Sequence, residues 1–411
     1  MKKALDNIRV LDLSRVLAGP FCTQTLGDLG AEILKVEKPG AGDDTRGWGP
    51  PFVKDEAGNE TSESAYYLSC NRNKKSIAVD IRSPEGQDII RKLIAKSDVV
   101  IENFKTGGLK KYGLSYDDLK DEHPHLIYCS ISGFGQNGPL ASEPGYDFLA
   151  QAMTGLMACT GEPDEPPMKV GVALSDIMTG LNAAVGILAA LNHRHETGKG
   201  QHIDLALTDC TLASLTNIAQ YYLTSGQCAK RQGNAHPSIV PYQAFEAKDG
   251  HVILAVGNDS QFARFANFVG KSEWADDERF ATNAGRVNNR ETLAPLIQEI
   301  LAQETIAHWI EELHGVDVPC GPVNSMDKVF EMEQIQARGM EIEMDHALSP
   351  DPVHLVGSPL KLSETPVSYD ISPPICGQHT TQILEKLLDL SHEEITQLKE
   401  KGIVDAASSG D

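Results

Sequence analysis

The sequence predicts an α/β fold, in which helices cover both faces of a parallel sheet and a smaller α/β domain is attached. Three observations carry this prediction. Strand-like and helix-like segments alternate through the N-terminal half, and a new run of both begins near residue 250. The chain, at 411 residues, is also long enough for two or three domains.

The first segments form a strand–helix–strand unit. Residues 8–14, IRVLDLS, alternate as a strand does, and after the link RVLAGP residues 21–30 have a helical pattern. AEILKVE, which starts at residue 31, is the second strand, and a right-handed crossover is expected between the two. No GxGxxG follows the first strand, so the pattern does not favour a dinucleotide site.

Later segments continue the alternation. A long helix is expected from Asp176 to about His195, and Gly198 can end it in the left-handed conformation. Residues 251–257, HVILAVG, open the second region, and a helical tail closes the chain. Further strands are expected at 76–81, 98–104, 125–135 and 202–209, and a further helix at 84–97.

Composition excludes some classes of function. The chain has 36 Lys and Arg against 58 Asp and Glu, a net charge of -22, which argues against nucleic-acid binding. An anionic ligand held by a few local cations stays compatible with this charge. The pairs HPH and HRH lack a third ligand, so no metal site is expected.

The compartment is predicted from three absences. The eight cysteines form no CxxC motif, which favours free thiols in a reducing compartment. The N-terminus carries no signal-peptide pattern, and no run of about 18 uninterrupted apolar residues predicts a membrane span. We expect a cytoplasmic protein without membrane attachment, or a mitochondrial matrix protein whose leader has been removed.

Asp176 stands out in the apolar segment GVALSDIMTGLNAAVGILAAL, residues 171–191, where it is the one ionisable side chain. An unpaired carboxylate there is costly unless it is neutralised, hydrogen-bonded or open to a cavity. Asp before a helix is a good N-cap, so capping is one interpretation. A nucleophile that faces a cleft is the other, and one carboxylate can do both.

Several phrases together resemble a known family. These are LDLSRVLAGPFCTQTLGDLGAEILKVEKPGAGDDTR, NRNKKSIAVD, DVVIENF, SGFGQNGP, GYDF and ALSDIMTG, in this order. They resemble the class III CoA-transferases, the family of carnitine CoA-transferase and formyl-CoA transferase. The similarity extends through DVPCGPVNS to GQHTTQIL. PGAGDDTRGWGPPF and GNAHPSIVPYQAF look most like the branch that includes the succinyl-CoA:glutarate or hydroxymethylglutarate CoA-transferases.

The resemblance implies a Rossmann-like, CoA-binding large domain, a small α/β domain and an interlocked homodimer. It also implies transfer of CoA from a donor such as succinyl-CoA to a dicarboxylic acid such as glutarate, through an aspartyl-CoA thioester on Asp176. CoA thioesters would be substrates, with no permanent cofactor. The expected bounds are 1–205, completed by 365–411, for the large domain, 206–227 for a linker, 228–335 for the small domain and 336–364 for a returning linker.

Nine residues match CoA-contact positions of the family. Backbone contacts are expected in the first strand-to-helix loop, and cations are expected around the phosphates of CoA. For each cation, an ordinary surface Lys or Arg is the alternative, and Arg72, Lys74 and Lys75 add charge nearby. The nine are Val16, Leu17, Ala18, Lys38, Arg82, Asn103, Phe104, Lys111 and Tyr146.

Four further residues are expected on the substrate side: Arg46, Trp48, Asp147 and His236. Arg46 suits the distal carboxylate of a dicarboxylate, and a surface ion pair with a neighbouring aspartate is its alternative. In each case the family resemblance, rather than spacing, places the residue near the active site.

Two other functions stay open at this point. The α-methylacyl-CoA racemases share the fold and have His where this chain has Tyr146; a phenol with a pKa near 10 is a poor proton shuttle. A non-catalytic acyl-CoA-binding protein is the second alternative, if Asp176 only caps a helix.

Overall fold

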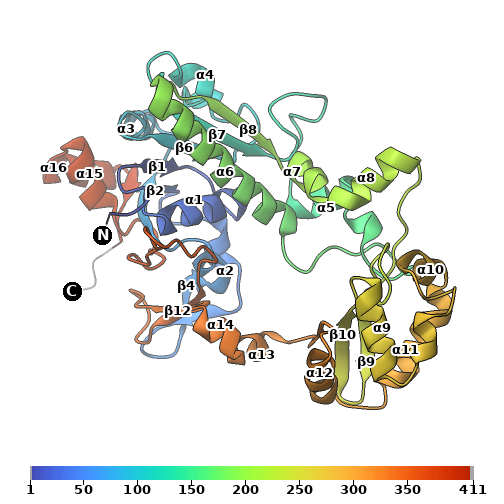
Figure 1. The fold of residues 1–411 in the computed structure, drawn as a ribbon. Helices are drawn as coiled ribbons and strands as arrows, with labels where there is room; N and C mark the ends of the chain where they lie inside the picture. Colours follow the sequence, from blue (N-terminus) through green and yellow to red (C-terminus); the bar gives the residue numbers. More distant parts are fainter. Residues whose placement is uncertain (1, 408–411) are drawn as a thin grey trace. The chain divides into compact units, whose positions relative to one another are not determined.

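The computed structural model describes residues 2–407, which divide into two compact units (Figure 1). Unit 1 is made of the chain up to Leu156, Val170–Ala219 and the chain from Gln334 onward. Unit 2 is made of Met157–Lys169 and Gln220–Glu333.

A seven-stranded sheet forms the centre of unit 1, in the order β14-β5-β2-β1-β6-β7-β8. All neighbours pair in parallel except β14. Leaving β14 aside, the strands lie in the order third, second, first, fourth, fifth, sixth, the Rossmann order, which confirms the predicted parallel sheet. The strands are β1 (Arg9–Asp12), β2 (Glu32–Glu37), β5 (Lys74–Val79), β6 (Val99–Glu102), β7 (Ile127–Ser132), β8 (His202–Ala206) and β14 (Val404–Asp405).

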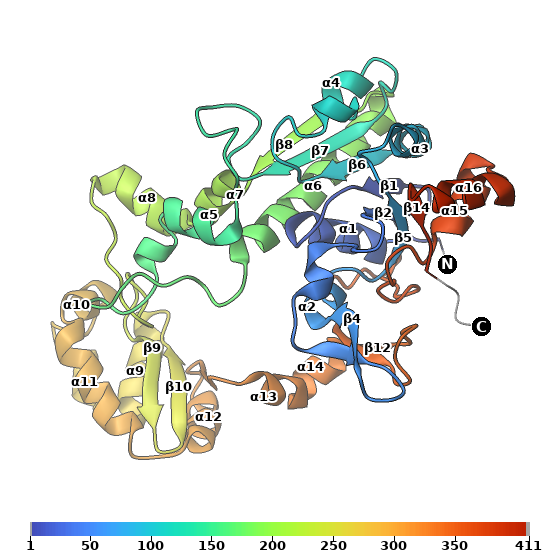
Figure 2. The same ribbon diagram turned by 180° about the vertical axis from the view of Figure 1, so that it is seen from behind.

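Alternate residues of these strands fill two separate cores. Leu11 and Val100 face one core and their neighbours Val10 and Val99 face the other, because side chains alternate across a sheet. Figure 2 shows helices on both sides of the sheet. The first core is covered by α3 (Pro84–Ile94), α4 (Tyr116–Leu119), α15 (Thr380–Leu388) and α16 (His392–Glu400), the second by α1 (Ala18–Asp28), α6 (Leu174–Thr197) and α7 (Leu207–Ser214).

Helix α6 is the long helix expected from the sequence. It begins at Leu174, two residues before Asp176, and Gly198 ends it at a φ of 73°, as predicted. By length and composition alone, α6 is the one helix among residues 2–407 that could cross a membrane. One of its faces packs in the second core, with Ala183 and Ile187 fully buried.

Two sequence expectations are corrected in this region. The strand expected at 202–209 ends at Ala206, and α7 follows because Leu207, Cys210 and Thr211 are buried at helical spacing. The expected linkers 206–227 and 336–364 also contain regular structure. They contain α7, α8 (Thr216–Ser225), the end of α14 (Glu333–Ala337) and the hairpin of β12 (Glu341–Met344) and β13 (Val353–Val356).

Several short elements of the two units lack a clear sequence pattern. Those that matter for the site follow β2 and precede β5, where a hairpin and two short helices connect the strands. They are η1 (Asp44–Gly47), β3 (Phe52–Lys54), β4 (Glu60–Ser64) and α2 (Ala65–Leu68). The others are η2 (Lys110–Tyr112), α5 (Asp147–Met153), η3 (Met157–Cys159) and α13 (Met326–Glu331).

Unit 2 has its own core under a three-stranded antiparallel sheet, in the order β11-β10-β9. Phe245, Phe262 and Trp309 are buried in this core. Its strands are β9 (Tyr242–Ala247), β10 (Gly250–Ala255) and β11 (Cys320–Pro322). Its helices are α9 (Asp259–Phe268), η4 (Ser272–Ala275), α10 (Asn283–Asn288), α11 (Arg290–Leu301) and α12 (Ile306–Gly315).

Candidate active site

Asp176 does not cap helix α6. Because the helix begins at Leu174, Asp176 is its third residue, and no side chain of the cap residue Ala173 bonds to the helix. The cap comes from α5: Asp147 Oδ1 accepts the Ser175 N–H at 2.8 Å. The interpretation of Asp176 as a helix cap is therefore wrong, and Asp147, expected on the substrate side, supplies that cap.

The Asp176 carboxylate has no hydrogen bond or ion pair with any residue in the described range 2–407. Burial and the nearby charge of Asp147 raise its pKa to about 7. Because the Asp176 carboxylate is partly desolvated and has no partner, both of its oxygens are available to attack an electrophile. Such a carboxylate, half-ionised near neutral pH, has the properties of a nucleophile.

Helix α6 packs closely on α1 at Gly180. A Cβ atom at Gly180 would lie 2.6 Å from the carbonyl oxygen of Ala18, so only glycine permits this contact. Asp176 is one turn earlier on the same face of α6. Asp176 therefore lies on the face of α6 that packs against α1.

This β1–α1 loop contains a strained residue. Val16 has a φ of 70°, a conformation that a β-branched side chain rarely adopts. Its N–H donates to the Asp43 carboxylate at 3.2 Å, and its carbonyl oxygen accepts from the Cys70 thiol at 3.7 Å. The contacts on both sides of Val16 hold the loop in this conformation.

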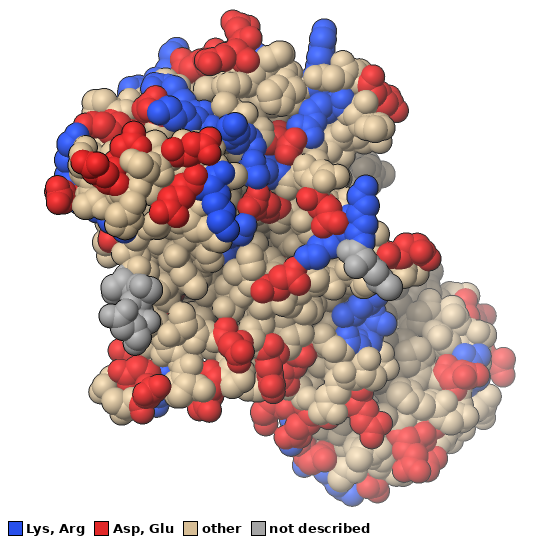
Figure 3. All heavy atoms as spheres, turned by 90° about the vertical axis from the view of Figure 1, so that its left-hand side faces the viewer, with Lys and Arg blue, Asp and Glu red and all other residues tan. Residues whose placement is uncertain are grey.

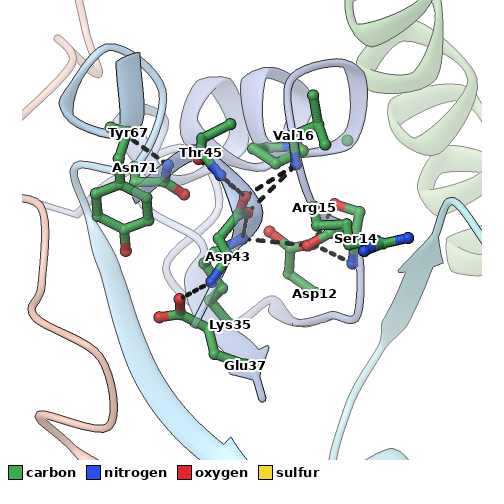
Figure 4. A network of polar contacts seen from close by, with 12 residues as sticks. Asp12, Ser14, Arg15, Val16, Lys35, Glu37, Asp43, Thr45, Tyr67 and Asn71 are labelled. Atoms are coloured by element: carbon green, nitrogen blue, oxygen red, sulfur yellow. Dashed lines mark hydrogen bonds and ion pairs between the residues drawn. The ribbon is translucent and has the colours of Figure 1, made fainter. Parts of the chain in front are cut away.

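A buried ionic network lies beneath the loop (Figure 4). Lys35 Nζ donates to Asp43 at 2.8 Å and to the Ser14 carbonyl oxygen at 3.1 Å, with both side chains of the ion pair fully buried. Asp43 also accepts the Thr45 N–H, which starts η1. The Lys35 charge lowers the pKa of Asp43 to about 2 against its desolvation, so this carboxylate stays ionised.

Tyr66 is a site residue that the sequence analysis missed. After burial, the Asp176 carboxylate is the largest contribution that raises the pKa of Tyr66 to about 12. The Tyr66 ring meets the ring of Trp48 edge-on, with centroids 5.2 Å apart. Trp48 is 47% exposed, so this aromatic pair reaches the surface of the molecule. The YY pair after β4 gave no periodic signal that could have distinguished Tyr66 from its buried neighbour.

A cavity of about 600 Å³ opens at the carboxyl ends of β1, β2 and β5. Ligands of Rossmann-type sheets bind at this edge. Three of the expected CoA contacts, Lys38, Arg82 and Phe104, line the cavity. Arg82 pairs there with Asp80 at 2.8 Å. The cavity is large enough for part of a nucleotide-sized ligand.

Two other expected contacts, Asn103 and Lys111, adjoin residues that line this cavity, whereas Tyr146 is not among the lining residues. The Asn103 side chain holds the backbone of Arg15, and the exposed Lys111 ammonium lies 4.7 Å from the ring centroid of Tyr112, which lines the cavity. Tyr146, the residue before α5, is 71% exposed. Figure 3 shows Lys and Arg side chains interspersed with acidic ones on the face that it draws.

The structure corrects the expectation for Arg46. Its guanidinium is buried and donates to both Glu37 and Glu63, to the Tyr67 hydroxyl and to the Pro374 carbonyl oxygen. Every N–H group has an acceptor, so none is left for a substrate carboxylate. The alternative, a surface pair with a neighbouring aspartate, is also wrong, because the partners are buried glutamates.

The three cations of the segment 72–75 do not face the cavity either. Arg72 and Lys74 are buried, and Lys75 packs at the surface of the sheet. Their carboxylate partners are Asp28 for Arg72, Asp12 for Lys74 and Glu32 for Lys75.

His236 belongs to unit 2, where its Nδ1 accepts the Ser238 N–H at 3.1 Å and its ring meets Tyr242. Within residues 2–407, no group of three or more His, Cys, Asp or Glu side chains is placed to hold a metal ion.

Residues 5–380 match the family model described as "CoA-transferase family III". The chain belongs to this family. It is 45% identical over 403 residues to a succinyl-CoA:glutarate CoA-transferase of Homo sapiens, covering 98% of this chain and 90% of that protein. It is 47% identical to a succinate–glutarate CoA-transferase of Agrobacterium fabrum, covering 94% and 96%.

A solved structure of a related protein supports the same family assignment. A CAIB/BAIF family protein from Brucella suis has a TM-score of 0.84 and 48% identity, covering 94% of this chain and 100% of that one. As a family III CoA-transferase, the protein is an enzyme that transfers CoA. Family membership removes the non-catalytic alternative.

Replacing Asp176 with Asn is expected to stabilise the protein at neutral and alkaline pH. Folding raises the pKa of Asp176 to about 7, so its stabilising contribution is complete at low pH and is lost as pH rises through 7. The gain in unfolding free energy for Asp176→Asn should be about 2–3 kcal/mol at pH 8 and near zero at pH 4. Denaturant unfolding at both pH values measures it, and an equal gain at both would contradict the pKa.

Two substitutions of Asp147 distinguish its role as the cap of α6 from the effect of its charge on the Asp176 pKa. Asp147→Ala should lower the unfolding free energy by about 1 kcal/mol, because the Ser175 N–H loses its acceptor. Asp147→Asn keeps an acceptor and should retain stability, while removing the like charge that raises the Asp176 pKa. The acid limb of the pH–rate profile should then move to lower pH in Asp147→Asn. An unmoved limb would show that Asp147 has no electrostatic role.

Proposed function

We propose that the protein moves CoA from succinyl-CoA to a dicarboxylic acid such as glutarate, with Asp176 as the covalent carrier. The observation that carries the proposal is the unpartnered, partly buried Asp176 carboxylate on the face of α6 that packs against α1. The named activities of the human and Agrobacterium relatives support the two substrates.

The proposed reaction has four balanced steps. An Asp176 oxygen attacks the donor thioester, which gives a mixed anhydride and CoA thiolate. The thiolate attacks the Asp176 carbonyl carbon of the anhydride, which releases the donor acid and leaves an aspartyl-CoA thioester. The carboxylate of the acceptor attacks this thioester and expels the thiolate again. The thiolate then attacks the acceptor carbonyl, which forms the new acyl-CoA and restores Asp176.

The start of α1 supports a role in charge stabilisation. The helix begins at Ala18 with no side-chain cap from any of the described residues. Helix N-termini present unpaired N–H groups and a positive dipole end. We propose that the backbone of Leu17 and Ala18 donates to the oxyanion that forms when Asp176 or CoA thiolate attacks a carbonyl group.

CoA would lie in the cavity at the sheet edge, with Lys38, Arg82 and Lys111 near its phosphates and Asn103 and Phe104 at the wall. Trp48 and Tyr66 are then placed to contact the acyl group, and Tyr146 and His236 remain candidate contacts of CoA and acceptor. CoA thioesters act as substrates, with no permanently bound cofactor.

A second copy of the chain is proposed to cover the apolar surface of α5, α6 and α7. These helices pack against one another, and exposed apolar side chains occur on each. Phe148 is 59%, Val185 66% and Leu212 53% exposed. Patches of this kind mark interfaces, which fits a homodimer.

Cytoplasmic location is proposed because Cys22 and Cys129 are buried free thiols.

A kinetic experiment tests the proposed function. Transfer from succinyl-CoA to glutarate should fall by at least about 10³-fold in Asp176→Asn, because the nucleophile is removed. In the wild type, kcat/KM should rise with pH and level off above about 7, as Asp176 ionises. Unchanged transfer by Asp176→Asn would refute the mechanism. Deuterium exchange at C2 of a 2-methylacyl-CoA would indicate a racemase instead.

The proposed dimer is tested by solution mass. Light scattering should show two chains for the wild type and one for the double variant Val185→Glu, Leu212→Glu, because charge at a buried interface is costly. Leu296→Glu, which alters an exposed leucine of unit 2, is the control and should not change the mass. A monomeric wild type would contradict the proposal.

A further inference from the structure

Arg15 is a basic residue of the cavity that neither family resemblance nor sequence pattern assigned. It follows β1 and lines the cavity together with Lys38 and Arg82. Its side chain is 56% exposed, and one Nη1–H donates to the Asp44 carboxylate at 2.6 Å. Asp44 is itself 49% exposed and lines the same cavity.

The backbone of Arg15 is held firmly. Asn103 Oδ1 accepts the Arg15 N–H at 3.0 Å, and Asn103 Nδ2 donates to the Arg15 carbonyl oxygen at 2.7 Å. The next residue is the strained Val16, which Asp43 holds. With its backbone fixed on both sides, Arg15 loses less conformational freedom when its side chain binds a ligand.

The guanidinium has binding capacity left. Asp44 is the one side-chain partner of Arg15 among the residues of the described range. Figure 4 shows the Arg15 side chain extending away from Lys35 and Asp43, so it does not join the buried network. A guanidinium with several unused donors suits a phosphate group, which it can bind through two parallel hydrogen bonds.

We propose that Arg15 is a ligand of the diphosphate of CoA, and that Asp44 competes with the diphosphate for the Arg15 guanidinium. The inference rests on the proposed binding of CoA in this cavity.

The position of Arg15 along the cavity selects the diphosphate. The thiol end of CoA must reach Asp176, which lies on the face of α6 that packs against α1, and the loop of Val16 and Leu17 leads directly into α1. Arg15 adjoins that loop, whereas Arg82 lines the cavity from the β5–α3 connection. In CoA, the diphosphate is closer to the thiol than the 3′-phosphate is. Arg15 is therefore placed to bind the diphosphate.

Calorimetric titration with free CoA tests the assignment. Arg15→Gln should weaken CoA binding about ten- to a hundred-fold, the range of a lost charge-assisted hydrogen bond. Asp44→Asn should tighten it about two- to five-fold, because an exposed competitor for Arg15 is removed. The caps of η1 depend on Asp43 and not on Asp44, so this variant should fold normally.

A matched pair in unit 2 provides the control. Arg279 pairs with Asp277 and is 57% exposed, close to the exposure of Arg15. Arg279→Gln and Asp277→Asn make the same changes in net charge and should leave CoA affinity unchanged. Thermal melts of all four variants verify that they are folded.

Binding of 3′-dephospho-CoA, which lacks the 3′-phosphate, tests whether Arg15 contacts the diphosphate. The loss caused by Arg15→Gln should be equally large with this ligand, since it retains the diphosphate. A loss that disappears with 3′-dephospho-CoA would overturn the assignment to the diphosphate. Equal CoA affinity of the wild type and folded Arg15→Gln would overturn the role of Arg15. A wild type that binds no CoA would instead refute the proposed function.

Discussion

The ion pair between Lys35 and Asp43 is the interaction on which the geometry of the site depends. Both side chains are fully buried, where an unpaired charge would cost several kcal/mol. The Asp43 carboxylate also holds the strained Val16 through its N–H and starts η1 through Thr45. One carboxylate therefore fixes the β1–α1 loop and the loop that carries Trp48. The strain at Val16 persists because these contacts leave it no alternative conformation.

Asp147 and Asp176 have different roles at the start of α6. Asp147 bonds to the helix N-terminus, so Asp176 is left without a partner and keeps both oxygens available. The like charge of Asp147, together with burial, raises the pKa of Asp176 into the neutral range. The contact of Gly180 with α1 holds the face of α6 that carries Asp176 against α1. Reactivity and orientation thus arise from separate residues.

The sequence predicts the sheet because the alternation of strands and helices is a local property, and it predicts Asp176 because an acid in an apolar segment is conspicuous. It could not predict partners that are remote in the chain. Asp147 caps a helix 28 residues away, and Arg46 is enclosed partly by Pro374, 328 residues away. Periodicity carries no information on such pairs, so Arg46 was expected at the substrate and Arg15 was overlooked.

Mass analysis of the covalent intermediate shows whether Asp176 carries CoA. The enzyme is incubated with succinyl-CoA and no acceptor, and intact mass is followed by peptide analysis. A thioester-linked CoA adduct, which hydroxylamine removes, is expected on the peptide that contains Asp176, and no adduct is expected in Asp176→Asn. An adduct on a different residue, or transfer by an enzyme that never carries CoA covalently, would contradict the role of Asp176 as the carrier.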